Sequence, residues 1–368
     1  MPKITIDIHN YSELDVFLKK HKASYGGAFT HTSISGNRGS FYIPDKDLND
    51  FFNIYYNHVF VNKQQAYLTE GIRDCYVTPV KIDLDFGLYK NTDKEIPDKI
   101  YELEDIIKIC QRYISVMENW LVSPDTKERY CFILEKPHAR YDMDKSGNIK
   151  LNENGEKRIK DGVHIMFPYI TTDIELQLIF RDNIYKNVGD IFDKYNYDES
   201  YADIFDKAVI DRNNWQMYGS NKGVGFETYK VTKIIEVYSD SYKEIPLDNY
   251  TNEELLRLLS VRNRLDASMI QYEKQIVIDD IKEKKRIVEQ KRKNCSSRSK
   301  TSKNKTNKDE LKLVMGYEDK GVYYNGFVDC LDIERTKSYI TWIEVGWALH
   351  NIDNTSKKFS KAKEKYNQ

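Results

Sequence analysis

The sequence is poor in cysteine, and this scarcity excludes two classes of small stabilised domain. Its five cysteines are odd in number, and no two of them are spaced as Cys-x-x-Cys: Cys75, Cys110, Cys131, Cys295 and Cys330. A disulfide framework uses an even set of cysteines, and a zinc finger needs closely paired ligands. We therefore expect neither a disulfide framework nor a zinc finger. The scattered cysteines fit a protein that works in a reducing compartment.

Long apolar runs and phosphate loops are also absent. No stretch approaches 18 uninterrupted apolar residues, and the N-terminal MPKITIDIHNYSELDVF has no basic segment followed by an apolar one. The sequence thus predicts neither a membrane span nor a secretory signal. No G-x-x-x-x-G-K-[ST] motif occurs, so we expect no ATP-driven unwinding by this chain alone.

The chain has no overall excess of charge, because 57 Lys and Arg stand against 58 Asp and Glu in 368 residues. Residues 282–308 nevertheless hold twelve Lys or Arg and two Glu, a local charge of +10, so the remainder carries −11. An acidic body with one basic arm argues against a uniformly cationic nucleic-acid binder. The arm is interpreted as a solvated tether, with contact to nucleic-acid phosphates as the alternative.

Three regions follow from composition and periodicity. Residues 1–250 mix alternating apolar runs with helical patterns, which predicts a body of mixed α and β structure. Residues 251–310 are expected to form a charged helix, capped by Thr251 and Glu254, and then the basic linker. Residues 311–368 resume apolar patterning. Within the first region, residues 141–160 have the Gly, Asp and Asn content of a long solvated hairpin.

Residues 80–89, VKIDLDFGLY, alternate like a strand but carry two carboxylates. Asp83 and Asp85 share one strand face, with Cα atoms roughly 6.6 Å apart. Like charges held side by side are unfavourable without a cation, and hard carboxylate ligands suit Mg²⁺, Mn²⁺ or Ca²⁺. The alternative for this short motif is an edge strand with a wet acidic face.

Two later segments supply groups that could complete such a site. In KDGVHIMFPY, residues 160–169, alternation places Lys160, Gly162 and His164 on one face, where the glycine would leave room for a ligand. In IFDKAVIDRNNWQMYGSNK, residues 204–222, two acids, Asp206 and Asp211, precede a strand-like stretch. Its alternate positions form a polar face: Asn214, Gln216, Tyr218 and Ser220.

Taken in order, these three segments resemble motifs I, II and III of the archaeo-eukaryotic primase superfamily, the catalytic core of PrimPol-type primase-polymerases. The likeness is to the primase part of the primase-helicases of large nucleocytoplasmic DNA viruses. LTEGIRDCYVTPVKIDLDF, KDGVHIMFP and NWQMYGSNK carry it, and RTKSYITWIEVGWALHNID with FSKAKEKY resembles the PriCT-type C-terminal domain. The resemblance covers most of the chain.

The resemblance implies an α+β fold in which an N-terminal α/β module packs against an RRM-like antiparallel sheet, with the acids in the cleft between them. A helical, PriCT-like segment, expected to be incomplete, would follow at residues 311–368. The implied activity is two-metal, template-directed primer synthesis on single-stranded DNA from NTPs or dNTPs. A helicase, in the same polypeptide or separate, is the implied partner, and the location would be intracellular, in the host cytoplasm or a viral replication site.

Carried over by position, the resemblance implies that Asp83, Asp85 and Asp206 bind Mg²⁺ or Mn²⁺, with Asp211 as the alternative third ligand. His164, Gly162, Lys160, Ser220 and Lys222 would bind the nucleotide. Two departures affect this set, because Gly162 stands where many members have Ser and Gln216 where PrimPol-like members have Arg. The competing functions are a catalytically inactive replication scaffold that binds DNA and a glycosyltransferase with an Asp-x-Asp metal site.

Overall fold

The computed structural model describes residues 11–36, 38–72, 77–91, 96–121 and 126–262, with the single positions 279, 283 and 286. The chain divides into two units, residues 1–284 and 285–368, and every element below belongs to the first. The predicted basic linker and the apolar segment 311–368, apart from those single positions, lie outside the described residues.

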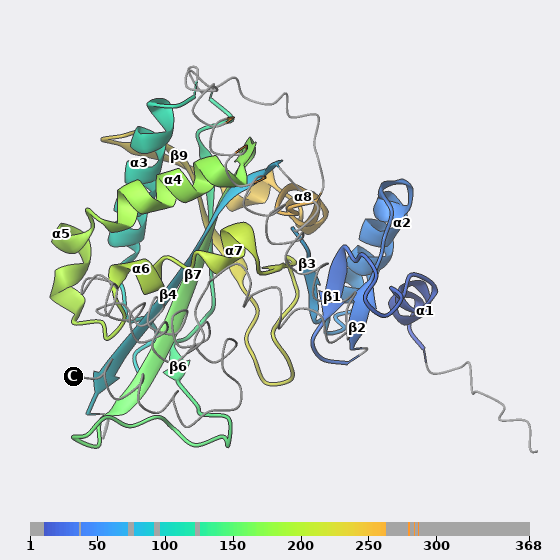
Figure 1. The fold of residues 1–368 in the computed structure, drawn as a ribbon, viewed down its shortest axis with the longest axis horizontal. Coiled ribbons are helices and arrows are strands. Elements are labelled where there is room, and N and C mark those ends of the chain that lie inside the picture. The colour runs from blue at the N-terminus through green and yellow to red at the C-terminus, as the bar shows by residue number, and fades with distance from the viewer. Residues whose placement is uncertain are drawn as a thin grey trace, which may run out of the picture. The chain divides into compact units, whose positions relative to one another are not determined.

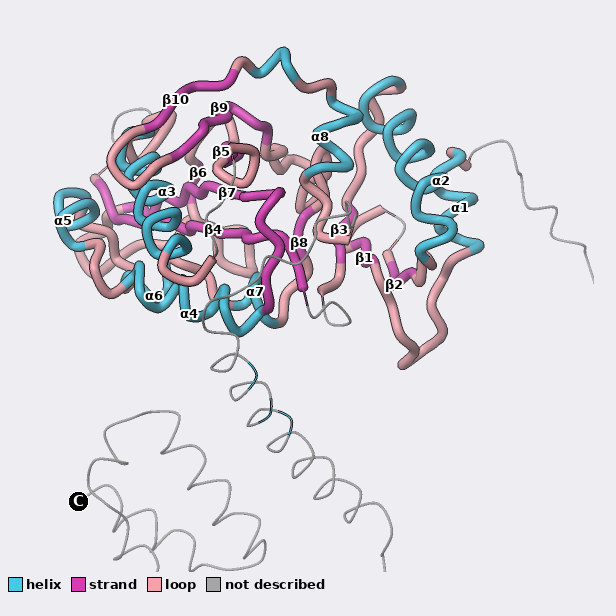
Figure 2. Tube along the Cα trace, turned by 90° about the horizontal axis from the view of Figure 1, so that it is seen from above, coloured by secondary structure: helices cyan, strands magenta, loops and turns pink. Residues whose placement is uncertain are grey.

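The larger of two sheets is antiparallel and carries the Asp-x-Asp strand at one edge. Its order is β10-β9-β5-β7-β4, with β6 paired to β7 (Figure 2). The strands are β4 (Val77–Lys90), β5 (Tyr130–Glu135), β6 (Arg140–Tyr141), β7 (Lys157–Asp173), β9 (Lys230–Val237) and β10 (Tyr242–Ile245). The two longest strands, β4 and β7, pair along their whole length, so the predicted strands around residues 80–86 and 163–167 are neighbours in one sheet.

Alternation along β4 and β7 determines which face of this sheet is buried against helices. Ile82, Leu84, Val163 and Ile165 lie in the main hydrophobic core, which also contains the apolar face of α3 (Leu103–Glu118). The other helical elements on this core are α4 (Ile174–Tyr185), α5 (Gly189–Phe192), η3 (Asp193–Tyr195) and α6 (Tyr201–Ile204). Helix α4 lies beside β4 and β7 (Figure 1). Because neighbouring residues of a strand point to opposite faces, the other face of the sheet carries the odd-numbered acids of β4.

A second, four-stranded antiparallel sheet is built mostly from the N-terminal residues. Its order is β2-β1-β3-β8, from β1 (His31–Ser33), β2 (Gly39–Phe41), β3 (Leu68–Glu70) and β8 (Trp215–Gln216). It packs with α1 (Glu13–Lys20) and α2 (Asp45–Tyr56), which continues into a π-helical turn, Asn57–Val61. Because β8 comes from the third motif segment, that segment joins the N-terminal sheet to the rest of the body.

The last described helix, α8 (Asn252–Leu258), begins as its sequence predicts. Thr251 and Glu254 form the expected capping box, each side chain accepting a hydrogen bond from the other residue's backbone nitrogen. Leu255 and Leu258 are buried in the second core cluster, so this helix packs against the body. The turn η4 (Leu247–Asn249) precedes this helix. The remaining described helix, α7 (Ala208–Asp211), lies in the third motif segment.

The expected α+β class is confirmed, since helices and two antiparallel sheets make up the described body. The solvated hairpin is confirmed as well: bridges join Met143 to Ile149 and Leu151 to Lys157, and most of residues 142–156 are exposed. Among the described residues, no helix is both long and apolar enough to cross a membrane.

Candidate active site

The paired strands β4 and β7 place the first two motifs side by side. Asp83 is the cross-strand partner of His164, and Asp85 is the partner of Gly162. Directly opposed residues of an antiparallel pair point to the same face, so both acids and the histidine project away from the helix-packed core. Alternation had predicted this arrangement within each strand, but the register that brings His164 to Asp83 is a property of the fold.

The third acid arrives through a backbone contact with β4. Phe205 forms an isolated bridge with Leu84, and the backbone nitrogen of Asp206 donates to the carbonyl oxygen of Asp83 over 3.0 Å. Phe205 is buried in the main core, and the Nε of Arg181 donates to its carbonyl oxygen over 2.7 Å. The segment is therefore fixed on both sides, and Asp206 is held next to the acids of β4.

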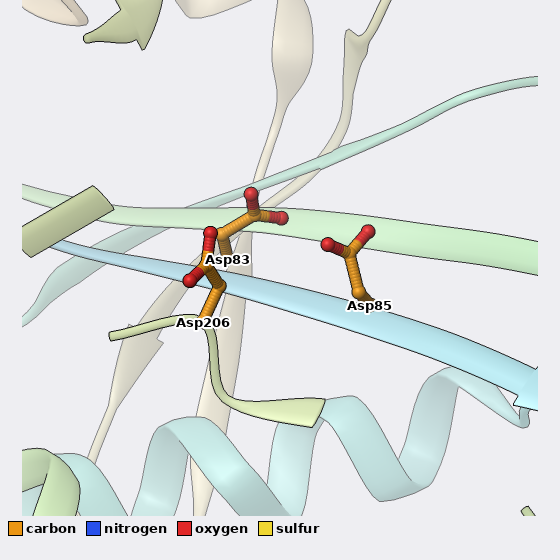
Figure 3. A group of neighbouring side chains, drawn as sticks. All are labelled: Asp83, Asp85 and Asp206. Carbon is orange, nitrogen blue, oxygen red and sulfur yellow. The ribbon is translucent and has the colours of Figure 1, made fainter. Parts of the chain in front are cut away.

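Carboxylate oxygens of Asp83, Asp85 and Asp206 all lie within 4.8 Å of one another. Figure 3 shows the three side chains gathered on one side of β4, two from the strand and one from the segment beside it. Two Mg–O bonds span about 4.2 Å, so small rotations would bring this set to a shared ion. Asp211 is not part of the group, and its carboxylate pairs with Arg212 at 3.1 Å.

The environment of Asp83 gives a second reason to expect a cation at the three acids. Its Oδ1 is buried and has no hydrogen-bond partner. Burial, and then repulsion by Asp85 and Asp206, raise the pKa of Asp83 well above its ordinary value, while Lys222 and Lys136 oppose this. A buried carboxylate in this position is costly without an added positive charge. The donor set therefore fits a hard divalent ion.

His164 is enclosed by aromatic rings. It stacks on Tyr229 with ring centroids 3.7 Å apart and packs against Trp215 at 4.5 Å. Its Nε2 lies 3.5 Å from Oδ1 of Asp83. Burial, and then the charges of Lys136 and Lys222, lower the pKa of His164 well below its ordinary value, so the ring is neutral at physiological pH.

A cavity of about 460 Å³ opens beside these groups, between the two sheets. Its lining includes the three acids, His164, Lys222 and polar residues of β1, β3 and the third motif segment: Thr32, Thr69, Asn213, Asn214, Gln216 and Asn221. Asn214 is held in place because its Nδ2 donates to Thr32 Oγ1 at 2.9 Å and to Thr69 Oγ1 at 3.1 Å. The volume is within the range of small-molecule sites.

The comparisons with known proteins agree with this geometry. The family described as "C962R protein N-terminal AEP domain" matches residues 30–235, more than half of the chain and the stretch that contains all three acids and His164. The chain belongs to this archaeo-eukaryotic primase family.

Two relatives of this AEP chain are viral proteins with helicase names. "Putative helicase L207/L206" of Acanthamoeba polyphaga mimivirus is 27% identical over 342 residues, covering 88% of this chain and 33% of the relative. "Putative helicase 184R" of Invertebrate iridescent virus 6 is 26% identical over 225 residues, covering 57% of this chain and 22% of the relative. The chain thus spans a third or less of either relative, and the recognition of an AEP primase of large DNA viruses is confirmed.

The structure separates the predicted nucleotide-binding residues of this AEP domain into two groups. His164 and Lys222 line the cavity, whereas Lys160, Gly162 and Ser220 are not among its lining residues. Lys160 lies farther along β7, opposite Arg140 of β6. Ser220 is fully buried: its Oγ accepts from Leu68 N at 3.0 Å, so its placement favours a structural role. The expected strand alternation ends at Gln216, which explains why Ser220 does not share the polar face.

The space expected above Gly162 is filled. A Cβ on this residue would lie 2.9 Å from the Tyr229 hydroxyl and 3.0 Å from the Leu84 carbonyl oxygen. Tyr229 and Lys136 are two site neighbours that the sequence reasoning missed. Lys136 directly follows the predicted strand YCFILE, and Tyr229 lies five residues before the predicted strand IIEVY, but nothing in the sequence singles out either residue.

Proposed function

We propose that this chain is a primase or primase-polymerase that joins nucleotides on a single-stranded DNA template during viral-type DNA replication. The observation that carries the proposal is the convergence of Asp83, Asp85 and Asp206 beside His164, at a cavity inside the region matched by the AEP family. Membership of that family supports nucleotidyl transfer, and the glycosyltransferase alternative has no comparable support.

Asp83, Asp85 and Asp206 would hold divalent cations, Mg²⁺ or Mn²⁺. When bound, such ions supply polarisation of the reacting phosphate and a lowered pKa for the attacking hydroxyl. The protein's own contribution is to present three carboxylates on rigid main chain, because two lie on a long paired strand and the third is bridged to it. Preorganised ligands avoid reorganisation during the reaction.

His164 and Lys222 would orient the nucleotide. The neutral imidazole can donate or accept a hydrogen bond without adding charge, and its packing against Tyr229 and Trp215 would favour one orientation of the ring. Lys222 is exposed on the rim of the same cavity and supplies positive charge toward a triphosphate. The polar group Thr32, Asn214 and Gln216 on the N-terminal sheet would face the base, the sugar or the template.

A helicase is the proposed partner, in the same polypeptide or as a separate protein. The support is indirect: both viral relatives carry helicase names and extend well beyond the region that this chain matches. The inactive-scaffold alternative predicts DNA binding without nucleotide incorporation, so an activity assay separates the two functions.

The test is primer synthesis by the full chain on single-stranded DNA with Mg²⁺ or Mn²⁺, using labelled NTPs and dNTPs in separate reactions. We expect template-dependent products from the parent protein and none from the Asp83→Asn/Asp85→Asn variant. Products of equal yield from both proteins would show that the acids are not a catalytic site. Template binding by the parent without any product would favour the scaffold function.

A further inference from the structure

Four cations on this side of the molecule have no carboxylate partner of their own among the described residues: Lys136 and Lys222 act on the charge of Asp83, Arg140 acts on that of Lys136, and Lys160 pairs with Arg140. None of the four forms an ion pair with an acid in that part of the chain. Elsewhere the body pairs its cations readily; Arg158, for example, contacts Asp142, Asp198 and Glu199. A group of unpaired cations next to a catalytic centre is complementary to a polyanion.

Lys136 is the member of this group whose position is most closely defined. It directly follows β5, and its Nζ lies 4.3 Å from the centroid of the Tyr229 ring. The Tyr229 ring also stacks on the ring of His164, with an interplanar angle of 21°. Lys136, Tyr229 and His164 therefore form one continuous stack that runs from the cation to the side of Asp83. An ammonium over an aromatic face is held there by electrostatic attraction.

Two segments are joined along their length next to His164, just outside the set of residues that line the cavity. Lys136 contacts Tyr229, His138 Nδ1 lies 2.8 Å from Glu227 Oε1, and the Arg140 guanidinium lies 5.1 Å from the Phe226 ring centroid. These three contacts pair the segment after β5 with the segment before β9. Arg140 is then the cross-strand partner of Lys160. Lys136 therefore lies on the same joined segments as Arg140, and its charge is influenced by Arg140 and by Asp83 and Asp85.

The electrostatics support the same picture. Burial lowers the pKa of Lys136 to about 8, and repulsion from Lys222 and Arg140 adds to this, while Asp83 and Asp85 oppose it. A half-buried lysine beside other cations is unfavourable in the free protein and becomes favourable when a polyanion binds. The acid pair is too far from Lys136 to form an ion pair with it, so that role remains available to a ligand.

We propose that Lys136 binds the distal phosphates of the nucleoside triphosphate and that Tyr229 is the positioning residue that holds its ammonium in place. The inference rests on the proposed function, because the acids define where the reacting phosphate would lie. The β- and γ-phosphates extend away from that point, and Lys136 with Arg140 offers charge there. Template phosphate is the competing ligand, and the test below distinguishes it.

The decisive measurement is the affinity of the full chain for three probes in Mg²⁺ buffer without template: a nucleoside triphosphate, the matching monophosphate and inorganic tripolyphosphate. The affinity for single-stranded DNA is measured separately in the same buffer. We expect Lys136→Gln to weaken binding of the triphosphate and of tripolyphosphate about tenfold or more, as charge-assisted contacts typically do. Monophosphate affinity should change less than about twofold, because that ligand lacks the distal phosphates. Lys136→Arg should retain affinity within about threefold.

Lys157→Gln is the matched control. Lys157 also lies over a tyrosine, with Nζ 5.4 Å from the Tyr141 ring centroid, but it points to the opposite face of β7 from Lys160 and His164. This variant should bind all three probes like the parent. If both Gln variants lose affinity equally, the effect is one of overall charge and the proposal fails.

Tyrosine variants test the positioning role. Tyr229→Phe keeps the ring and should retain tripolyphosphate affinity within about threefold, whereas Tyr229→Leu removes the ring and should weaken it as much as Lys136→Gln. The double variant Lys136→Gln/Tyr229→Leu should lose no more than either single change. Should the Leu variants fail to fold, as melting curves would show, Lys136→Gln and Lys136→Arg still decide the ligand.

Each result has one meaning. Unchanged triphosphate and tripolyphosphate affinity in Lys136→Gln overturns the proposal, as does a parent that binds no tripolyphosphate. A loss confined to single-stranded DNA affinity also overturns it and assigns Lys136 to the template. If the parent makes no primers but binds tripolyphosphate through Lys136, the proposed function fails while this inference stands. If the parent makes primers and Lys136→Gln binds normally, only the inference fails.

Discussion

The backbone nitrogen of Asp206 donates a hydrogen bond to the carbonyl oxygen of Asp83 over 3.0 Å, so main chain ties the third acid to the first. The carboxylate of Asp206 takes no part in this bond. Its Oδ1 accepts a hydrogen bond from the Ala208 backbone nitrogen over 2.8 Å. Changing the Asp206 side chain should therefore alter the ligand set without releasing the segment from β4.

The first prediction compares the two acids of the third segment. Asp206→Asn should abolish nucleotide incorporation and reduce the rise in melting temperature on adding Mn²⁺, because one of three ligands is lost. Asp211→Asn should leave both properties unchanged, since Asp211 pairs with Arg212 outside the acid group. Melting curves with and without Mn²⁺ measure the effect. The reverse result would make Asp211 the third ligand.

The second prediction concerns stability in the absence of metal. Asp83→Asn/Asp85→Asn should melt at the same temperature as the parent or a few degrees higher, since it removes repulsion of the buried Asp83 carboxylate by the half-buried Asp85 and Asp206. A gain of about 1 kcal/mol corresponds to roughly 2–4 °C for a domain of this size. Acids that served a structural network would instead lower the melting temperature when replaced, because their partners would be left unpaired. Calorimetry in EDTA distinguishes the two.

The third prediction separates nucleotide binding from metal binding. His164→Phe keeps a ring between Tyr229 and Trp215 but removes both ring nitrogens. We expect nucleotide affinity to fall about tenfold, as for a lost hydrogen bond to a charged group. The Mn²⁺-induced rise in melting temperature should persist, since all three carboxylates remain. Loss of that rise would mean that His164 supports the metal site.

The fourth prediction tests the shared space of Gly162 and Tyr229. Gly162→Ser should destabilise the protein by about 1–3 kcal/mol, because its Cβ would meet the Tyr229 hydroxyl at 2.9 Å. Removing that hydroxyl in the Gly162→Ser/Tyr229→Phe variant should recover part of the loss. Urea denaturation of the two single variants and the double variant measures the coupling. Strict additivity would place the strain at the Leu84 carbonyl oxygen instead.

The fifth prediction is a pH dependence of triphosphate binding. The groups around Lys136 are Tyr229, Lys222, Arg140, Asp83 and Asp85. Its pKa is lowered to about 8, so the ammonium is present below that pH and is lost as the pH rises through it. The affinity of the parent for triphosphate should decline above about pH 8. The affinity of the Lys136→Arg variant should not decline there, because arginine stays charged. The same decline in both proteins would assign the titration to another group.

Within each strand, the sequence determined which residues share a face. The two-residue period of VKIDLDF separates Ile82 and Leu84, which are buried, from Asp83 and Asp85, and the same period places His164 opposite Val163 and Ile165. Such patterns are readable because side-chain direction in a strand depends only on the local backbone. The capping box at Thr251 is local for the same reason.

Tertiary structure alone decided how these faces combine. The resemblance favoured Asp206 over Asp211, but the position of Asp206 beside the acids of β4 depends on a bridge between Phe205 and Leu84, which are 121 positions apart, and on the core that buries Phe205. The burial of Ser220 follows from a turn that ends a two-residue strand. Lys136 and Tyr229 come next to His164 only because two distant segments pair there. No local period encodes such contacts, since they arise from packing between segments far apart in the chain.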